Sequence, residues 1–176
     1  MAFVRAVMRS ALDRTGDPVQ ALELMNHILV DERRTGLFVT ILAGVLDLDT
    51  GVFAFANAGH ERPLIARADG SEPWWVEGNG PLVGVFGRLN LTLQRTEIRP
   101  GERMILYTDG ITDAQAPDGS RFGEGRLLQT IAASCRGDGT AAATVSAVIR
   151  SVLEFQGAAS PADDLALLVF RRLPTG

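Results

Sequence analysis

The sequence predicts an α+β protein, from the order of its segments, the spacing of its apolar residues and its length. Apolar side chains at helical spacing mark residues 1–31, and short apolar runs bounded by turn residues follow. Two more helical segments and a last apolar strand end the chain. Helices and strands are thus segregated, unlike the alternation of a βαβ fold. The length of 176 residues favours one domain over residues 1–176.

The first segment predicts a helix over residues 1–13, where apolar positions alternate with arginines at helical spacing. The sequence Thr15-Gly16-Asp17-Pro18 interrupts it. Asp17 is a good N-cap, Pro18 suits a first helical position, and Gln20 has capping-box spacing. A second helix is therefore expected to run to about Asp31, with His27 facing solvent or packing.

Strand patterns follow at 37–46, 52–56 and 63–66, with a short edge at 74–76. The segment Asp47-Leu48-Asp49-Thr50-Gly51 predicts a hairpin turn; a metal loop is the less favoured alternative, because Asp and Gly are typical turn residues. Residues 89–98 alternate apolar and polar side chains, which predicts a strand buried on one side.

The most informative stretch is Met104–Asp113. It contains most of an apolar strand expected over 103–108, which stops at Thr-Asp-Gly. Asp109 can be a metal ligand on a rigid strand end, or Asp109-Gly110 can be a plain turn. Helices are expected at 123–135 and 140–156. A second acidic site, Asp163-Asp164, then precedes a last strand over 165–170.

Composition excludes several classes of function. With a net charge of −4 and no basic stripe, the chain is not expected to bind nucleic acid. Without lysine it cannot form a lysine Schiff base. The one cysteine, Cys135, is expected to be a small buried side chain and permits no intrachain disulfide. No segment is typical of a membrane span or a signal peptide, so a cytoplasmic location is expected.

The two acidic sites belong together if their strands are neighbours in a sheet. Asp109 and Asp163 would then share one edge, where paired carboxylates repel unless a cation lies between them. The available donors are oxygens, which suit Mg²⁺ or Mn²⁺ rather than structural zinc. Such sites activate water and hold phosphoryl oxygens.

An ordered set of motifs, each weak by itself, gives the chain a family resemblance. The motifs are Phe38-Val39-Thr40 with Leu46-Asp47, Asn57-Ala58-Gly59-His60-x-x-Pro63, Pro81-Leu82-Val83-Gly84-Val85, Pro100-Gly101-Glu102-Arg103, Leu106-Tyr107-Thr108-Asp109-Gly110-Ile111-Thr112-Asp113, Arg121-Phe122-Gly123 and Asp163-Asp164-Leu165-Ala166. Their order and spacing resemble the SpoIIE/RsbU-type branch of the bacterial metal-dependent Ser/Thr phosphatases, relatives of protein phosphatase 2C, over nearly the whole chain.

The resemblance implies two packed antiparallel β-sheets flanked by helices, with the helical pair at 1–31 and the sandwich core and outer helices at 37–172. It implies hydrolysis of phosphoserine or phosphothreonine by a water bridging two Mn²⁺ or Mg²⁺ ions. Asp109 and Asp163 would be the metal ligands, and Gly110, Asp113, Asp164 and His60 would lie near them. For His60, packing at the end of a hairpin is an equal alternative. The implied substrate is a phosphorylated STAS-type anti-sigma-factor antagonist in a partner-switching pathway.

Departures from the family pattern add further expectations. Members begin with a Gly-Asp-x-x-Asp-like strand and an Asp-Val-x-Gly-His-Gly motif that supply further metal ligands; this chain starts inside the following helix, so we expect an incomplete site and weak activity. Ala166 replaces the usual Thr, and Asp113 replaces the commoner Glu. The alternative is a catalytically inactive module that keeps the phosphatase surface to bind a partner. Apolar residues freed on 1–31 would favour a homodimer.

Overall fold

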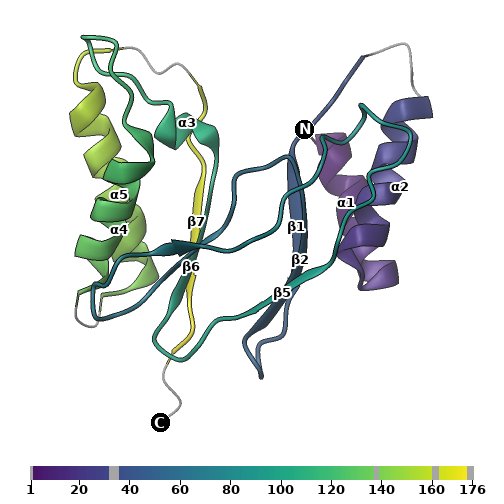
Figure 1. Cartoon of the computed structure of the whole chain (residues 1–176), viewed down its shortest axis with the longest axis horizontal. Coiled ribbons are helices and arrows are strands. Elements are labelled where there is room, and N and C mark those ends of the chain that lie inside the picture. Colours follow the sequence, from purple (N-terminus) through teal and green to yellow (C-terminus); the bar gives the residue numbers. More distant parts are fainter. Residues whose placement is uncertain (1, 32–35, 137–138, 160–162, 174–176) are drawn as a thin grey trace. The chain divides into compact units, whose positions relative to one another are not determined.

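The computed structural model describes residues 2–31, 36–136, 139–159 and 163–173. The chain forms two compact units, one from Met1–Arg62 and Glu77–Glu97 and the other from Pro63–Val76 and Ile98–Gly176. Each unit combines one antiparallel sheet with a pair of long helices (Figure 1). The α+β prediction, with two antiparallel sheets and flanking helices, is therefore confirmed.

In the first unit, helices α1 (Ala2–Thr15) and α2 (Pro18–Asp31) form a hairpin beside a three-stranded sheet. The turn between them follows the predicted capping chemistry. The Asp17 carboxylate accepts the N–H groups of Val19 and Gln20, at 2.8 and 3.4 Å, and the Gln20 side-chain amide at 2.8 Å. These bonds satisfy N–H groups that the first turn of α2 would otherwise leave free. As predicted, His27 is exposed.

The sheet of the first unit has the order β1-β2-β5, from β1 (Ile41–Leu46), β2 (Val52–Ala58) and β5 (Gln94–Glu97). The predicted hairpin turn joins β1 to β2, where Asp47 Oδ1 accepts the N–H groups of Asp49 and Thr50, each at 3.0 Å. The core between the helices and the sheet consists of small and aliphatic side chains. Its buried members are Met8, Ala11, Ala21, Leu22, Met25, Leu29, Ala43, Ala56, Ala58, Val83 and Leu89.

Two predicted strands of this unit are shorter than the sequence indicated. The run at 37–46 forms a strand only from Ile41. Before it, Val39 pairs with Val83 in an isolated bridge, and the pairing does not extend because Gly84, the residue after Val83, has a φ of +91° that no strand adopts. The run at 89–98 is strand only over Gln94–Glu97. Further along β2, Gly78 and Gly80 lie beside Asn57: the Asn57 side-chain amide donates to the Gly78 carbonyl at 3.2 Å, and a Cβ on Gly80 would lie 2.8 Å from the Asn57 carbonyl oxygen.

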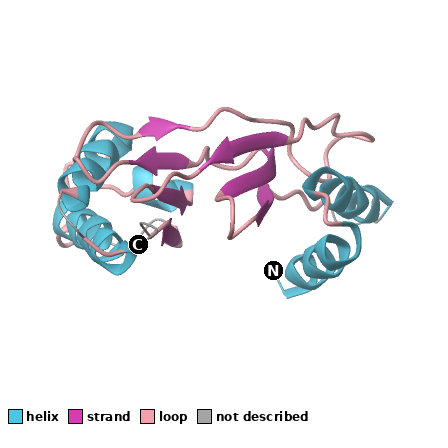
Figure 2. Cartoon of the chain, turned by 90° about the horizontal axis from the view of Figure 1, so that it is seen from below, coloured by secondary structure: helices cyan, strands magenta, loops and turns pink. Residues whose placement is uncertain are grey.

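In the second unit the sheet order is β4-β3-β6-β7, from β4 (Trp74–Trp75), β3 (Leu64–Ala66), β6 (Arg103–Tyr107) and β7 (Leu167–Arg171). Helices α4 (Gly123–Cys135) and α5 (Ala141–Gln156) match the predicted segments closely. They lie side by side near this sheet in Figure 1, and Figure 2 shows the same pair in cyan from below. Strand β6 is central and almost wholly buried, which fits its continuous apolar run.

The core of the second unit joins the sheet to α4 and α5. Phe122 packs edge-on against Phe155, with ring centroids 5.6 Å apart. Cys135 is a buried free thiol, as predicted. The remaining buried members are Leu64, Ala66, Ile105, Tyr107, Ile111, Ala114, Leu127, Ile131, Val148 and Val152. No helix within the described ranges is long and apolar enough to cross a membrane.

Candidate functional site

Asp109 lies where the central strand β6 gives way to a short helix, α3 (Asp109–Thr112). Thr108 is still extended, at φ −96° and ψ 155°, and Asp109 is the first helical residue with an exposed side chain. The Asp109 carbonyl accepts the N–H of Asp113 at 2.7 Å. The chain therefore turns at Asp109-Gly110, and the turn presents a carboxylate to solvent at the end of a rigid strand. The role of Asp109 as a metal ligand stays a prediction.

Asp163 lies just before β7, the strand that pairs with β6. Its side chain is exposed, and its Oδ1 accepts the N–H of Asp164 at 2.7 Å. Strands β6 and β7 are antiparallel, with Tyr107 opposite Leu167. The end of β6 and the start of β7 therefore share one edge of the sheet, as the sequence predicted for two neighbouring strands.

Gly110 shows how closely the two acidic segments approach each other. A Cβ built on Gly110 would lie 2.5 Å from the carbonyl oxygen of Asp164 and 3.6 Å from the Cβ of Asp163. Only a residue without a side chain permits this contact. The structure thus brings Asp109, Gly110, Asp163 and Asp164 together, and gives Gly110 a packing role that its place beside an aspartate did not reveal.

Asp113, predicted to lie near the metals, forms an ion pair with Arg121. Asp113 Oδ1 and Arg121 Nη1 are 2.8 Å apart, and the two side chains are 51% and 64% exposed. A loop closed by a bridge between Gln115 and Arg121 carries the arginine. Sequence reasoning missed this partner, although Arg121 stands in one of the family motifs.

The loop that carries Arg121 is held by a local turn. Asp118 Oδ1 accepts the Ser120 hydroxyl at 2.7 Å and the Ser120 N–H at 2.9 Å. These two hydrogen bonds lower the pKa of Asp118 below its usual value, because both stabilise the charged carboxylate.

His60 lies in the first unit, at the end of β2. Asn57 Oδ1 accepts the His60 N–H at 2.9 Å, and the Asn57 amide donates to the His60 carbonyl at 2.9 Å. The ring Nδ1 lies 3.3 Å from Thr40 Oγ1. These contacts support the packing interpretation of this histidine; its expected place near the metals stays a prediction.

The donors at the shared edge suit a hard metal ion. Asp109 and Asp163 offer carboxylate oxygens, and Mg²⁺ is commonly held by one or two carboxylates with water completing its shell. Within the described parts of the chain, no group of three or more His, Cys, Asp or Glu side chains is arranged to hold a metal. The chemistry of the two carboxylates suits Mg²⁺ or Mn²⁺, and their role as part of a ligand set stays a prediction.

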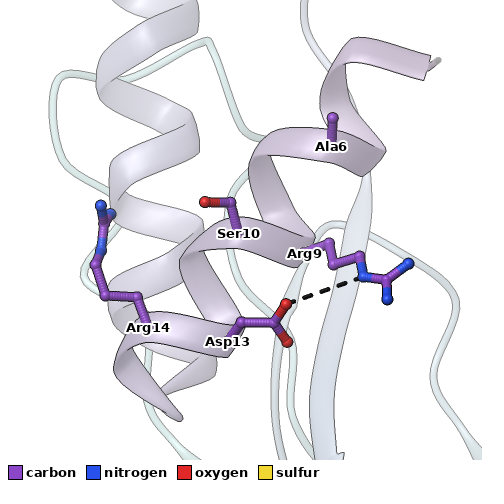
Figure 3. Close-up of a pocket in the computed structure, with 5 residues that line it drawn as sticks. All are labelled: Ala6, Arg9, Ser10, Asp13 and Arg14. Carbon is purple, nitrogen blue, oxygen red and sulfur yellow. Dashed lines mark ion pairs between the residues drawn. The ribbon is translucent and has the colours of Figure 1, made fainter.

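A hollow of about 550 Å³ on α1 offers a different environment (Figure 3). It is lined by Ala6, Arg9, Ser10, Asp13 and Arg14. Its one carboxylate, Asp13, lies 3.9 Å from Arg9, and both side chains are largely exposed. An exposed ion pair beside a second arginine lacks the paired carboxylates of a metal site, so the candidate site remains the edge at Asp109 and Asp163.

Comparison with known proteins places nearly the whole chain in one family. The sequence profile of the family described as stage II sporulation protein E (SpoIIE) matches residues 1–173. Protein IcfG of Synechocystis is 35% identical over 117 residues, which are 66% of this chain and 18% of IcfG. The phosphoserine phosphatase RsbU of Bacillus subtilis is 24% identical over 119 residues, 68% of this chain and 36% of RsbU. The chain thus spans well under half the length of either relative.

The fold is found in solved structures as well. The SiaA-PP2C domain of Pseudomonas aeruginosa superposes with a TM-score of 0.82 and 22% identity, covering 97% of this chain and 68% of that one. At this identity the likeness concerns the fold. It confirms that the two antiparallel sheets and their helices form the architecture of PP2C-type phosphatase domains.

Proposed function

The chain belongs to the SpoIIE family, and from that premise we propose that it is a metal-dependent protein phosphatase domain over residues 1–176. The observation that carries the proposal is the contact of Gly110 with Asp164, which joins two acidic segments distant in sequence at one sheet edge. Asp109 and Asp163 would hold Mn²⁺ or Mg²⁺ there. The metal, when bound, would polarise phosphoryl oxygens and activate water.

The proposed reaction is hydrolysis of phosphoserine or phosphothreonine on a protein. Water replaces the serine or threonine oxygen on phosphorus, and the alcohol and inorganic phosphate are released. The relative RsbU, described as a phosphoserine phosphatase, supports this substrate class. Within the family resemblance, the partner would be a phosphorylated STAS-type anti-sigma-factor antagonist in the cytoplasm. Because no group of three or more His, Cys, Asp or Glu side chains among the described residues is arranged to hold a metal, we expect weak metal binding and slow turnover for this chain by itself.

The test is Mn²⁺-dependent phosphate release from a phosphoserine peptide and from p-nitrophenyl phosphate. We expect Asp109→Asn and Asp163→Asn to remove whatever turnover the chain has, because each variant loses a charged oxygen ligand. Asp69→Asn is the matched control, since Asp69 is another exposed turn aspartate of the same unit. Turnover that survives both Asp109→Asn and Asp163→Asn would contradict the proposal, and fast Asp109-dependent turnover would contradict the expected weakness.

A second candidate function is a binding module without catalysis. It is favoured by the finding that no group of three or more potential ligand side chains gathers within the described residues. A pull-down with phosphorylated and unphosphorylated STAS-domain protein tests it. Binding without phosphate release would support the module, and absence of binding in both states would count against it.

Self-association through residues 1–31 is a further proposal about partners. Phe3 on α1 is 53% exposed, whereas Leu22, Met25 and Leu29 of α2 are buried within the unit. The hollow on α1 is lined mainly by polar side chains (Figure 3). Light scattering of the wild-type chain and of Phe3→Ser tests the proposal. A dimer that dissociates in the variant would support it, and a monomeric wild type would rule it out.

A further inference from the structure

Thr108 occupies the residue position at which β6 stops pairing as a strand. Its N–H donates to the carbonyl of Ala166 at 3.1 Å, which continues the β6–β7 ladder by one residue beyond Tyr107 and Leu167. In an antiparallel ladder, two residues paired in this way normally exchange both hydrogen bonds. The Ala166 N–H would then donate to the Thr108 carbonyl.

The Thr108 carbonyl is engaged elsewhere. It accepts the N–H of Ile111 at 3.0 Å, which starts the turn of α3. The Thr108 side chain replaces the Thr108 carbonyl in the ladder. Its Oγ1 accepts the Ala166 N–H at 3.0 Å and donates to the Asp164 carbonyl at 3.2 Å. A hydroxyl can do both, because it has one hydrogen to donate and two lone pairs. The strand can therefore turn into a helix without releasing the segment before β7.

We infer that Thr108 is a positioning residue whose hydroxyl sets the separation of the Asp109 and Asp163 carboxylates. Asp109 follows Thr108 directly, and Asp163 precedes the Asp164 carbonyl to which the hydroxyl donates. The inference rests on the proposed function, in which these two aspartates hold the metal.

If Thr108 had a purely structural role, loss of its hydroxyl would change the local main chain without changing Mn²⁺ affinity. Asp164 and Ala166 are exposed, so water can replace the hydroxyl as their hydrogen-bond partner. Loss of the hydroxyl should then loosen the Asp163–Ala166 segment locally and leave the rest of the unit folded. Two measurements separate these effects: amide hydrogen exchange at Ala166 in the metal-free protein, and Mn²⁺ affinity by calorimetry.

The variants are Thr108→Val, which keeps the branched shape without the hydroxyl, and Thr108→Ser, which keeps the hydroxyl. We expect Thr108→Val to speed exchange of the Ala166 amide and to weaken Mn²⁺ binding by about tenfold, as loss of two modest hydrogen bonds implies. Thr108→Ser should keep both the Ala166 exchange rate and the Mn²⁺ affinity near their wild-type values. Thr130→Val on α4 is the matched control, because among the described residues the Thr130 hydroxyl bonds Arg126 of α4 and Ser151 of α5.

The outcomes distinguish this inference from the proposed function. If the wild type and all variants bind no Mn²⁺, the proposed metal site is wrong, and Ala166 exchange still shows whether Thr108 holds the segment. If the wild type binds Mn²⁺ and Thr108→Val binds equally well, the positioning role is wrong. Failure of Thr108→Ser to rescue would also overturn it. Thr108→Ala is measured alongside, so that misfolding of the valine variant does not decide the result.

Discussion

Gly110 lies directly against the main chain of Asp164, with room for no side chain between them. The contact joins the turn after β6 to the segment before β7, which carry the two aspartates of the proposed metal site. The φ of Gly110 is not positive, so its backbone conformation does not require glycine. The contact with Asp164 explains why glycine is needed there: a larger residue would not fit.

Replacing Gly110 with alanine should therefore push the two segments apart. We expect Gly110→Ala to lower the free energy of unfolding by about 1–3 kcal/mol, the usual cost of overpacking, and to reduce Mn²⁺ affinity. Gly125→Ala on α4 is the control, because a Cβ there meets no atom within 4 Å. That helical substitution should stabilise the chain by about 0.5–1 kcal/mol. Urea unfolding of both variants measures the free energy of unfolding. An unchanged value for Gly110→Ala would refute the steric argument.

The ion pair of Asp113 with Arg121 predicts a minor role for Asp113 in metal binding. Both side chains are more than half exposed, so the pair should contribute less than about 1 kcal/mol to stability. Because Arg121 already balances the Asp113 charge, Asp113→Asn should weaken Mn²⁺ binding much less than Asp109→Asn or Asp163→Asn. Calorimetric titration of the three variants measures this. An equal loss in all three would make Asp113 a direct ligand.

The cap of α2 predicts a defined pH dependence of stability. Burial acts to raise the pKa of Asp17, but hydrogen bonds from the side chain of Gln20 and from the N–H groups of Val19 and Gln20, with the charge of Arg95, lower it below 3.8. A lowered folded-state pKa adds stability above the unfolded-state value, and this stability is lost as the pH falls through the folded-state value.

The comparison for this cap is Asp17→Asn, which can still cap the helix but does not titrate. The difference in unfolding free energy between wild type and Asp17→Asn should be constant above about pH 5 and shrink below the unfolded-state value of 3.8. Asp17→Ala should cost about 1 kcal/mol at neutral pH, as loss of an N-cap does. Thermal unfolding across pH 3–7, roughly the range of carboxyl titration, measures both effects. A pH-independent difference would contradict the cap assignment.

Asn26 links α2 to the loop after Val83. Its side chain is fully buried; Oδ1 accepts the Gly84 N–H and Nδ2 donates to the Phe86 carbonyl, each at 2.8 Å. Asn26→Ala should cost about 1–3 kcal/mol, because both loop groups lose their partner. The neighbouring exposed His27→Ala should stay within about 0.5 kcal/mol of wild type. Denaturant unfolding of the pair tests this, and equal stabilities would show that water replaces Asn26 without loss.

The sequence by itself determined the elements whose signals are local. Helices α4 and α5 were predicted almost to the residue, because apolar side chains at helical spacing are bounded there by turn residues. The hairpin at Asp47–Gly51 and the cap at Asp17 also depend on side-chain hydrogen bonds to nearby N–H groups. The placement of Asp109 at a strand end followed in the same way from an apolar run that stops at Asp-Gly.

Tertiary structure decided which segments are partners. The alternation over 89–98 indicates which side chains are covered, but pairing with β2 stops at Gln94, next to the place where Gly78 and Gly80 lie beside Asn57. The same holds at the candidate site. A threonine before an aspartate has no sequence signal for bonds to Asp164 and Ala166, and only the pairing of β6 with β7 creates them. Local patterns encode conformation and burial, whereas the meeting of Asp109 and Asp163 depends on a contact between strands far apart in the chain.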